Sequence, residues 1–297
     1  MVFDLHAHPG ATFQKGRPEY LGDEAHRRTV AGMQAGELTG AFFSLVADGP
    51  ADRTDAQRRG HARWIRQGGC GARTSDLQRA HREHAVAAYL ACEGGEFLEG
   101  DAGRVDQLYD DGVRSLQLVH YVPTVLGDLQ TQPSQHGGLS AAGKAVVKRL
   151  TAKGIVIDVA HASFETVRDV ASQTSAPLIL SHSILKLDDA RLLAARAIGV
   201  EHAKLVAGTG GVIGTWPSGF NASFDEFVAN TVRLIDTVGV DHVGLGTDMD
   251  GNLKPVLGDY TQLPDWLTAL RAKGLSATDV AKVAGGNMQR VLSQVIG

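Results

Sequence analysis

The first ten residues, MVFDLHAHPG, place two histidines one residue apart at the end of a short apolar run. On a β-strand, residues i and i+2 project to the same face, so His6 and His8 are predicted to point together. Two imidazoles side by side suit a shared metal ion, because histidine is the commonest metal ligand in proteins. The alternative is a pair of half-buried or surface histidines, and only the rest of the chain distinguishes the two.

Ionisable side chains also end several other apolar runs. Glu93, His120, His161, His182 and Asp248 each stand at the end of a run that predicts a β-strand. The near-continuous apolar character of these runs is typical of strands covered on both faces, as in a parallel sheet. The predicted strands are residues 2–8, 40–46, 85–93, 113–120, 155–161, 177–182, 211–216 and 242–248.

Segments with helical periodicity separate these strands. Helix start signals stand before four of them, where a serine can accept a hydrogen bond from the first turn: Ser140, Ser163, Ser223 and Ser276. Eight strands separated by helices is the number for a (β/α)8 TIM barrel. A length of 297 residues suits one such domain, spanning 1–297.

One stretch does not fit the alternation of strands and helices. Residues 47–84 are polar and charged, and their pattern predicts helix in two pieces. We interpret them as a polar helical insertion that extends the connection after the second strand. It forms either a wall or lid over the barrel mouth or a solvated insertion, and the sequence leaves both readings open.

The strand ends predict a metal site. In such barrels the active site lies at the C-terminal ends of the strands, and six of the eight strands deliver a histidine or a carboxylate to that end. A buried Glu93 without compensation is costly, and neutral imidazoles around a cation would provide the compensation. The predicted ligands are therefore His6, His8, Glu93, His161, His182 and Asp248.

The number of ligands favours two divalent ions over one. Five or six ligands exceed the three or four that a single zinc takes, and a carboxylate can bridge two ions about 3.5–4 Å apart. The natural partition places His6, His8 and Glu93 on one ion. The other ion then takes Glu93, His161 and His182. Ligand chemistry favours zinc, with manganese, iron and cobalt as alternatives.

The composition restricts the partners of the chain. A net charge of −4 with mixed signs argues against a nucleic-acid surface, and the apolar runs are too short to span a bilayer. A small-molecule partner is expected, while the formation of a homo-oligomer stays open. Two cysteines, Cys70 and Cys92, make no disulfide framework. Met1 leads directly into the first strand without a signal peptide, so we expect a cytoplasmic protein.

With these residues placed, the chain resembles the renal (membrane) dipeptidase family of metallopeptidases, within the amidohydrolase superfamily. The resemblance runs from Asp4 to about Leu292 and rests on several local patterns in order. They are CEGG around Glu93, LQLVH at His120, GGLSAAGKAVVKRL leading into IDVAH at His161, LSHS at His182, GLGTDMDG at Asp248 and GGNMQRVL near the end.

The resemblance implies a binuclear zinc barrel that hydrolyses the amide bond of dipeptides or related N-acyl amino acids, often with a D-residue on the C-terminal side. It implies that Glu93 bridges the ions and that His161 and His182 bind the second ion. By the same resemblance, His120 polarises the scissile carbonyl and Asp248 handles protons. An arginine in the helix after the sixth strand binds the substrate carboxylate; Arg196 is the best match, and Arg191 is the alternative.

Two positions depart from the family pattern. The family usually has His-x-Asp on the first strand, where this chain has His6 and His8. An anionic ligand is thereby exchanged for a neutral one, which leaves metal identity and substrate class open. Tyr121 follows His120 where a small polar residue is more usual, so we expect a different substrate pocket.

Three other functions compete with a dipeptidase. A metal-dependent nuclease or phosphodiesterase of the same superfamily uses similar ligands, but the acidic net charge and the GLGTDMDG and LSHS patterns argue against it. A dihydroorotase- or hydantoinase-like enzyme would have a carboxylated lysine at the end of the fourth strand to bridge the ions. This chain has His120 at that position, and Glu93 already supplies a bridge, which argues against this alternative. A non-catalytic barrel is the third alternative, since fold alone does not guarantee activity.

Overall fold

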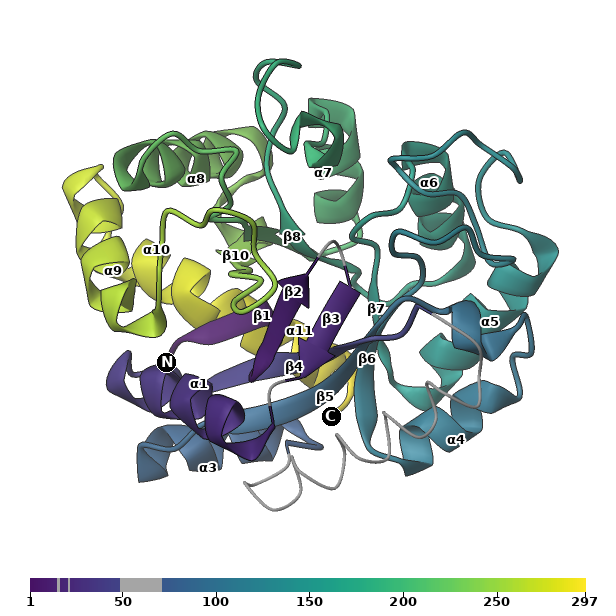
Figure 1. Ribbon diagram of the computed structural model, residues 1–297, viewed down its shortest axis with the longest axis horizontal. Helices are drawn as coiled ribbons and strands as arrows, with labels where there is room; N and C mark the ends of the chain where they lie inside the picture. Colours follow the sequence, from purple (N-terminus) through teal and green to yellow (C-terminus); the bar gives the residue numbers. More distant parts are fainter. Residues whose placement is uncertain (15–16, 21, 49–70) are drawn as a thin grey trace.

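Eight parallel strands close into a barrel in the computed structural model, which describes residues 1–14, 17–20, 22–48 and 71–297 (Figure 1). Around the barrel, each strand pairs with the barrel strands that precede and follow it in the chain, and β1 closes onto β10. All eight predicted strands are present, so the fold is the expected (β/α)8 TIM barrel. They are β1 (Phe3–Ala7), β4 (Gly40–Val46), β5 (Ala87–Glu93), β6 (Val113–Gln117), β7 (Val156–Asp158), β8 (Ile179–Ser183), β9 (Val212–Thr215) and β10 (Val243–Leu245).

Three strands end three residues earlier than the apolar runs predict. β6, β7 and β10 stop before His120, His161 and Asp248, which lie on the loops that follow these strands. His161 and Asp248 have φ angles of 65° and 54°. This left-handed conformation is unfavourable for residues other than glycine and is incompatible with continued strand pairing. The apolar pattern continues past the strand ends because the loop residues are also buried.

An irregularity in β1 controls the direction of its side chains. Asp4 pairs with Ala41 of β4, and Ala7 pairs with Phe43. Two residues of β1 therefore lie opposite one residue of β4, which is a β-bulge with one extra residue in β1. Phe3 and Leu5 pack with the buried residues inside the barrel, and the extra residue then turns His6 and His8 inward as well. Such bulges re-aim side chains and are common next to active sites.

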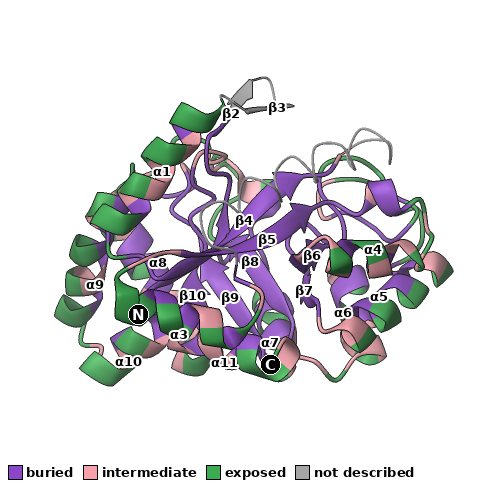
Figure 2. Cartoon of the chain, turned by 90° about the horizontal axis from the view of Figure 1, so that it is seen from below, coloured by how far each residue is buried: buried purple, intermediate pink, exposed green. Residues whose placement is uncertain are grey.

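The helices lie outside the barrel, with their buried faces toward the strands (Figure 2). Ser140, Ser163, Ser223 and Ser276 each accept a backbone hydrogen bond at a helix start, as predicted. The helices are α1 (Asp23–Ala35), α3 (Thr74–Glu83), α4 (Arg104–Asp110), α5 (Ala141–Lys153), α6 (Phe164–Gln173), α7 (Val200–Gly208), α8 (Phe224–Val238), α9 (Leu263–Ala272), α10 (Ala277–Ala281) and α11 (Asn287–Val295), with a π-helical turn at Lys282–Gly286. Among the described residues, every helix is too short or too polar to cross a membrane.

Two segments interrupt the alternation of strands and helices. An antiparallel hairpin, β2 (Ala11–Gln14) with β3 (Arg17–Tyr20), follows β1 and was not predicted. Residues 49–70 of the predicted insertion at 47–84 lie outside the described residues. The second predicted helical piece is α3, which packs against β5 and α11 at the end of the barrel opposite the hairpin (Figure 2).

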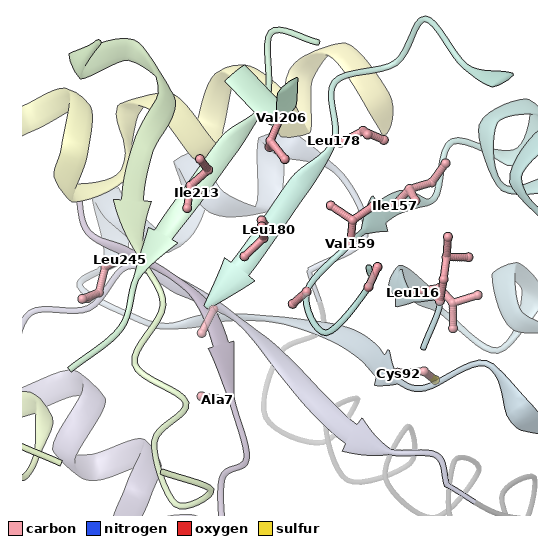
Figure 3. Packing of buried hydrophobic residues seen from close by; sticks show 14 of the residues in the cluster. Ala7, Cys92, Leu116, Ile157, Val159, Leu178, Leu180, Val206, Ile213 and Leu245 are labelled. Atoms are coloured by element: carbon pink, nitrogen blue, oxygen red, sulfur yellow. The ribbon is translucent and has the colours of Figure 1, made fainter. Parts of the chain in front are cut away.

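Two layers of apolar side chains hold the barrel together. The cluster between strands and helices includes Leu116, Leu180 and Ile213 of the strands and Val206 of α7 (Figure 3). A second cluster, which includes Phe3 and Tyr89, fills the barrel at its N-terminal end. The buried histidines at the strand ends lie at the opposite, C-terminal end of the barrel.

Candidate metal centre

Seven ionisable side chains from six strand ends converge at the C-terminal mouth of the barrel. All are buried, and most of them line one cavity of about 70 Å³ together with apolar residues. The strand ends bring into contact every histidine and carboxylate that the sequence analysis placed in the site: His6, His8, Glu93, His120, His161, His182 and Asp248.

Glu93 stands at the centre of this group. Its Oε1 atom lies 3.3 Å from His6 Nε2 and 3.4 Å from the Nε2 atoms of both His120 and His161. The same oxygen lies 3.8 Å from His182 Nε2, while Oε2 lies 3.3 Å from His8 Nε2. One carboxylate therefore contacts imidazoles from both halves of the barrel mouth.

The ligand atoms have the spacing of a coordination shell. His6 and His8 approach to 3.1 Å through their Nε2 atoms, and His161 and His182 approach to 3.2 Å. Atoms at about 2.0–2.1 Å from a tetrahedral zinc ion lie about 3.4 Å from each other. The residues present therefore fit bound divalent ions, since lone pairs of facing nitrogens otherwise repel unless a proton separates them.

Three sets of ligand atoms lie close enough to share an ion. They are His6, His8 and Asp248; His6, Glu93 and His182; and Glu93, His120 and His161. These sets overlap, and His6 contacts ligands from both of the predicted groups. The partition of ligands between two ions therefore stays a prediction.

Hydrogen bonds on the far side of two rings orient their Nε2 atoms toward the centre. His8 Nδ1 donates to the carbonyl oxygen of Ser44 at 2.8 Å, and His120 Nδ1 donates to Asp48 Oδ2 at 2.7 Å. Because the acceptors carry no proton, Nδ1 must carry it, which leaves Nε2 facing Glu93. The hydroxyl of Ser181 similarly contacts His182 Nδ1 at 2.9 Å.

The electrostatics of the site favour a cation. Burial disfavours the charged form of Glu93, but His120 and His6 outweigh it and hold the pKa of this carboxyl well below 4.5. Burial would lower the pKa of His8, yet Asp248 and Glu93 raise it to about 10. The two carboxylates thus attract positive charge to the His8 side of the cavity.

The imidazoles on the other side of Glu93 are neutral. Burial, followed by nearby positive groups, holds the pKa values of His161 and His182 well below 6.5. Neutral imidazoles are the form that binds metal ions. The site therefore combines neutral nitrogen donors with carboxylates that require a compensating charge.

The structure distinguishes the two candidate arginines. Arg196 is buried, and its Nη2 atom lies 3.3 Å from His182 Nε2. Arg191 instead forms an ion pair with Glu226, in which Nη1 and Oε1 are 2.7 Å apart. Arg196 lies in a short 3-10 turn, Ala194–Arg196, rather than in the helix after the sixth strand as predicted. Gln130 accepts a hydrogen bond from its Nη1 atom at 2.9 Å.

Sequence reasoning missed several residues of the site. Asp48 follows β4, and Trp216 follows β9, so inspection of all eight strand ends would have found both. Ser44 contacts both His6 and His8, but a serine inside an apolar strand gives no signal in the sequence. The cavity rim adds Leu193 and Leu253 from loops whose conformation no local pattern predicts.

The sequence was compared with known families and proteins, and the matches are to dipeptidases. The sequence model of the family described as Membrane dipeptidase (Peptidase family M19) matches residues 2–296. Dipeptidase aclJ of Aspergillus oryzae is 30% identical over 226 residues, which are 72% of this chain and 53% of the relative. Dipeptidase verJ of Clonostachys rogersoniana is 27% identical over 243 residues, covering 76% and 60% of the two chains. The chain thus spans little more than half the length of these fungal relatives.

Solved structures share the fold over the whole chain. A dipeptidase AC described as a metallopeptidase of the same family has a TM-score of 0.84 at 23% identity, with 100% of this chain and 98% of that chain covered. A metallopeptidase from Rhodobacter sphaeroides, liganded with a phosphinate mimic of the dipeptide L-Ala-D-Ala, has a TM-score of 0.82 at 22% identity, with 99% of each chain covered.

Proposed function

The chain belongs to the membrane dipeptidase family, peptidase family M19, and from this membership we propose that it hydrolyses the amide bond of dipeptides or related N-acyl amino acids with bound divalent metal ions. The observation that carries the proposal is the convergence of imidazoles around Glu93 at the barrel mouth. A cavity of about 70 Å³ at the barrel mouth favours short substrates over longer peptides.

We propose two ions per chain, with zinc as the first candidate. The donors are imidazole nitrogens and carboxylate oxygens, which suit zinc and, less selectively, manganese, iron or cobalt. Glu93 would bridge the ions through its two oxygens, and the remaining ligands are His6, His8, His161, His182 and Asp248. Bound divalent ions would supply a hydroxide nucleophile at neutral pH, because coordination lowers the pKa of water.

Asp248 is the proposed proton carrier. It lines the cavity, and its Oδ1 atom lies 3.3 Å from His8 Nε2. The loop that carries it is anchored by Asp250, which accepts hydrogen bonds from Gly10 N at 3.0 Å and Thr29 Oγ1 at 2.6 Å. A carboxylate held in this way takes a proton from the nucleophile and passes it to the leaving amine.

His120 and Arg196 are the proposed substrate-binding residues. His120 lines the cavity, and its Nε2 edge faces the interior of the site, where the imidazolium, with a proton on Nε2 as well as on Nδ1, can donate to the developing charge on the scissile carbonyl oxygen. The buried guanidinium of Arg196 offers a bidentate partner for the carboxylate of the substrate. Binding at both ends fixes the amide bond beside the ligands.

The test compares the wild-type protein with Asp248→Asn in hydrolysis of L,L-, L,D- and N-acylated dipeptides, with zinc, manganese or cobalt added. We expect turnover by the wild type and a loss of about 100-fold or more in the variant, with its metal content unchanged. Asp236→Asn, an exposed position on α8, is the control. Absence of turnover with every metal refutes the dipeptidase proposal, and turnover of phosphodiesters instead would favour the nuclease alternative.

A further inference from the structure

Two carboxyl groups lie behind His120, on the edge of the ring that faces away from Glu93. Asp48 follows β4, and its Oδ2 atom accepts a hydrogen bond from His120 Nδ1 at 2.7 Å. The other ring nitrogen, Nε2, lies 3.4 Å from Glu93 Oε1. The imidazole is therefore held between a carboxylate outside the metal centre and a carboxylate at its core.

This arrangement permits one orientation of the ring. An ionised carboxylate only accepts hydrogen bonds, so Nδ1 must carry a proton, and Nε2 donates to a carbonyl oxygen when the ring carries a second proton as an imidazolium. The ring also packs against the rings of His161 at 4.6 Å and Tyr121 at 4.5 Å between centroids. Rotation of the buried ring would break the bond to Asp48 and turn Nε2 away from the cavity.

Glu96 completes the group from the start of the 3-10 helix Glu96–Leu98. A Cβ atom built on Gly94 would lie 2.6 Å from Glu96 Oε2 and 3.1 Å from Asp48 Oδ1, so both carboxyl groups converge on the space above this glycine. Gly94 has a φ of +100°, which a residue with a side chain rarely adopts. The glycine thus makes room for two acidic side chains in contact.

Two ionised carboxylates cannot share this space without a partner. In the described part of the chain, both oxygens of Glu96 and Oδ1 of Asp48 are buried without a hydrogen-bond donor. A proton on Glu96 resolves the conflict, because a protonated carboxyl donates one hydrogen bond. In agreement, burial and then the Asp48 carboxylate raise the pKa of Glu96 to about 8.

We propose that Asp48 is a positioning residue for His120, and that Glu96, acting as a hydrogen-bond donor, holds Asp48 in place. Neither residue touches the substrate. The role follows from the proposed function, in which His120 Nε2 must meet the scissile carbonyl. Asp48 fixes the direction of that atom, and Glu96 satisfies the remaining oxygen of Asp48.

The first experiment uses Asp48→Asn in the zinc-loaded, full-length protein. With a dipeptide substrate we expect kcat to fall by about 10- to 100-fold, as is typical for the loss of a residue that orients a metal-binding histidine, while KM changes by less than about threefold. Asp101→Asn, an exposed carboxylate after the same 3-10 helix, should retain wild-type kcat. An unchanged kcat in Asp48→Asn would overturn the proposal.

The second experiment separates Glu96 from a simple packing residue. Glu96→Gln keeps a donor to Asp48 and should retain at least half of the wild-type kcat, whereas Glu96→Leu removes the donor and should lower kcat several-fold. Glu99→Gln is the exposed control. Equal losses in Glu96→Gln and Glu96→Leu would refute donation by Glu96. These variants also carry the test if Asp48→Asn does not fold.

A third measurement does not depend on catalysis. Nitrogen-15 NMR of histidine-labelled protein should show a hydrogen-bonded proton on His120 Nδ1, identified by its loss in His120→Gln. We expect Asp48→Asn to shift or broaden this signal and Asp101→Asn to leave it unchanged. An unaltered signal in Asp48→Asn contradicts the positioning role. If the wild type shows this signal but hydrolyses no dipeptide, the proposed function fails and the arrangement around His120 stands.

Discussion

The contacts of Glu93 make a quantitative prediction for the effect of metal ions on thermal stability. Its two oxygens reach imidazoles on both sides of the cavity at 3.3–3.4 Å. An ion present at 100 times its dissociation constant stabilises the folded protein by about 2.7 kcal/mol. Each kcal/mol raises Tm by about 2–4 °C in a large domain. One ion should therefore raise Tm by about 5–10 °C, and two ions by about 10–20 °C.

Glu93→Gln is the perturbation that tests this reasoning. The substitution keeps the shape of the side chain and removes the charge shared by both ions, so the variant should show less than half of the wild-type increase in Tm. The assay is calorimetry on protein stripped with a chelator, repeated during zinc titration, with bound metal counted by mass spectrometry. Glu99→Gln, at an exposed position, should behave as wild type. Equal increases in wild type and Glu93→Gln would refute the bridging role, and no increase in the wild type would refute the metal centre.

Two further predictions concern charged groups near the site. Because burial raises the pKa of Glu96 from 4.5 to about 8, the folded state binds a proton that the unfolded chain releases. The free energy of unfolding should therefore fall as pH rises from about 5 to about 8, by up to a few kcal/mol. Urea denaturation at several pH values should show a weaker fall in Glu96→Gln. If the free energy of unfolding has the same pH dependence in both proteins, Glu96 is not protonated in the folded state. Arg196→Met should lower kcat/KM for dipeptides with a free carboxylate by about 100-fold but change kcat/KM for C-terminal amides little. Arg191→Met should leave kcat/KM for both kinds of substrate near the wild-type value. An equal loss on both kinds of substrate in Arg196→Met would exclude carboxylate binding by Arg196.

Local patterns in the sequence were sufficient for the architecture. Apolar runs indicated all eight strands, since a strand covered on both faces has little room for polar residues. Serines at Ser140, Ser163, Ser223 and Ser276 marked helix starts because the cap is a contact over three residues. The β2–β3 hairpin was missed, since its short strands lack a clear apolar alternation.

The sequence was sufficient to predict which residues belong to the candidate site, but not which of them contact each other. A TIM barrel brings all strand ends to one face, so the histidines and carboxylates at the strand ends could be grouped without coordinates. The choice between Arg196 and Arg191 depends on how the loop after β8 folds back over the barrel, which involves contacts distant in sequence. Asp48 and Glu96 meet across two neighbouring strands, and no spacing along the chain reveals that meeting.

The bulge in β1 lets one short strand present the same face to two different surroundings. If this sequence paired with β4 in strict alternation from Phe3 onward, His6 and His8 would lie on the face opposite Phe3 and Leu5, among the helices. The extra residue therefore joins an apolar segment that belongs to the core to a polar segment that belongs to the barrel mouth. When related barrels are compared, the count of residues in the first strand is therefore as informative as their identity.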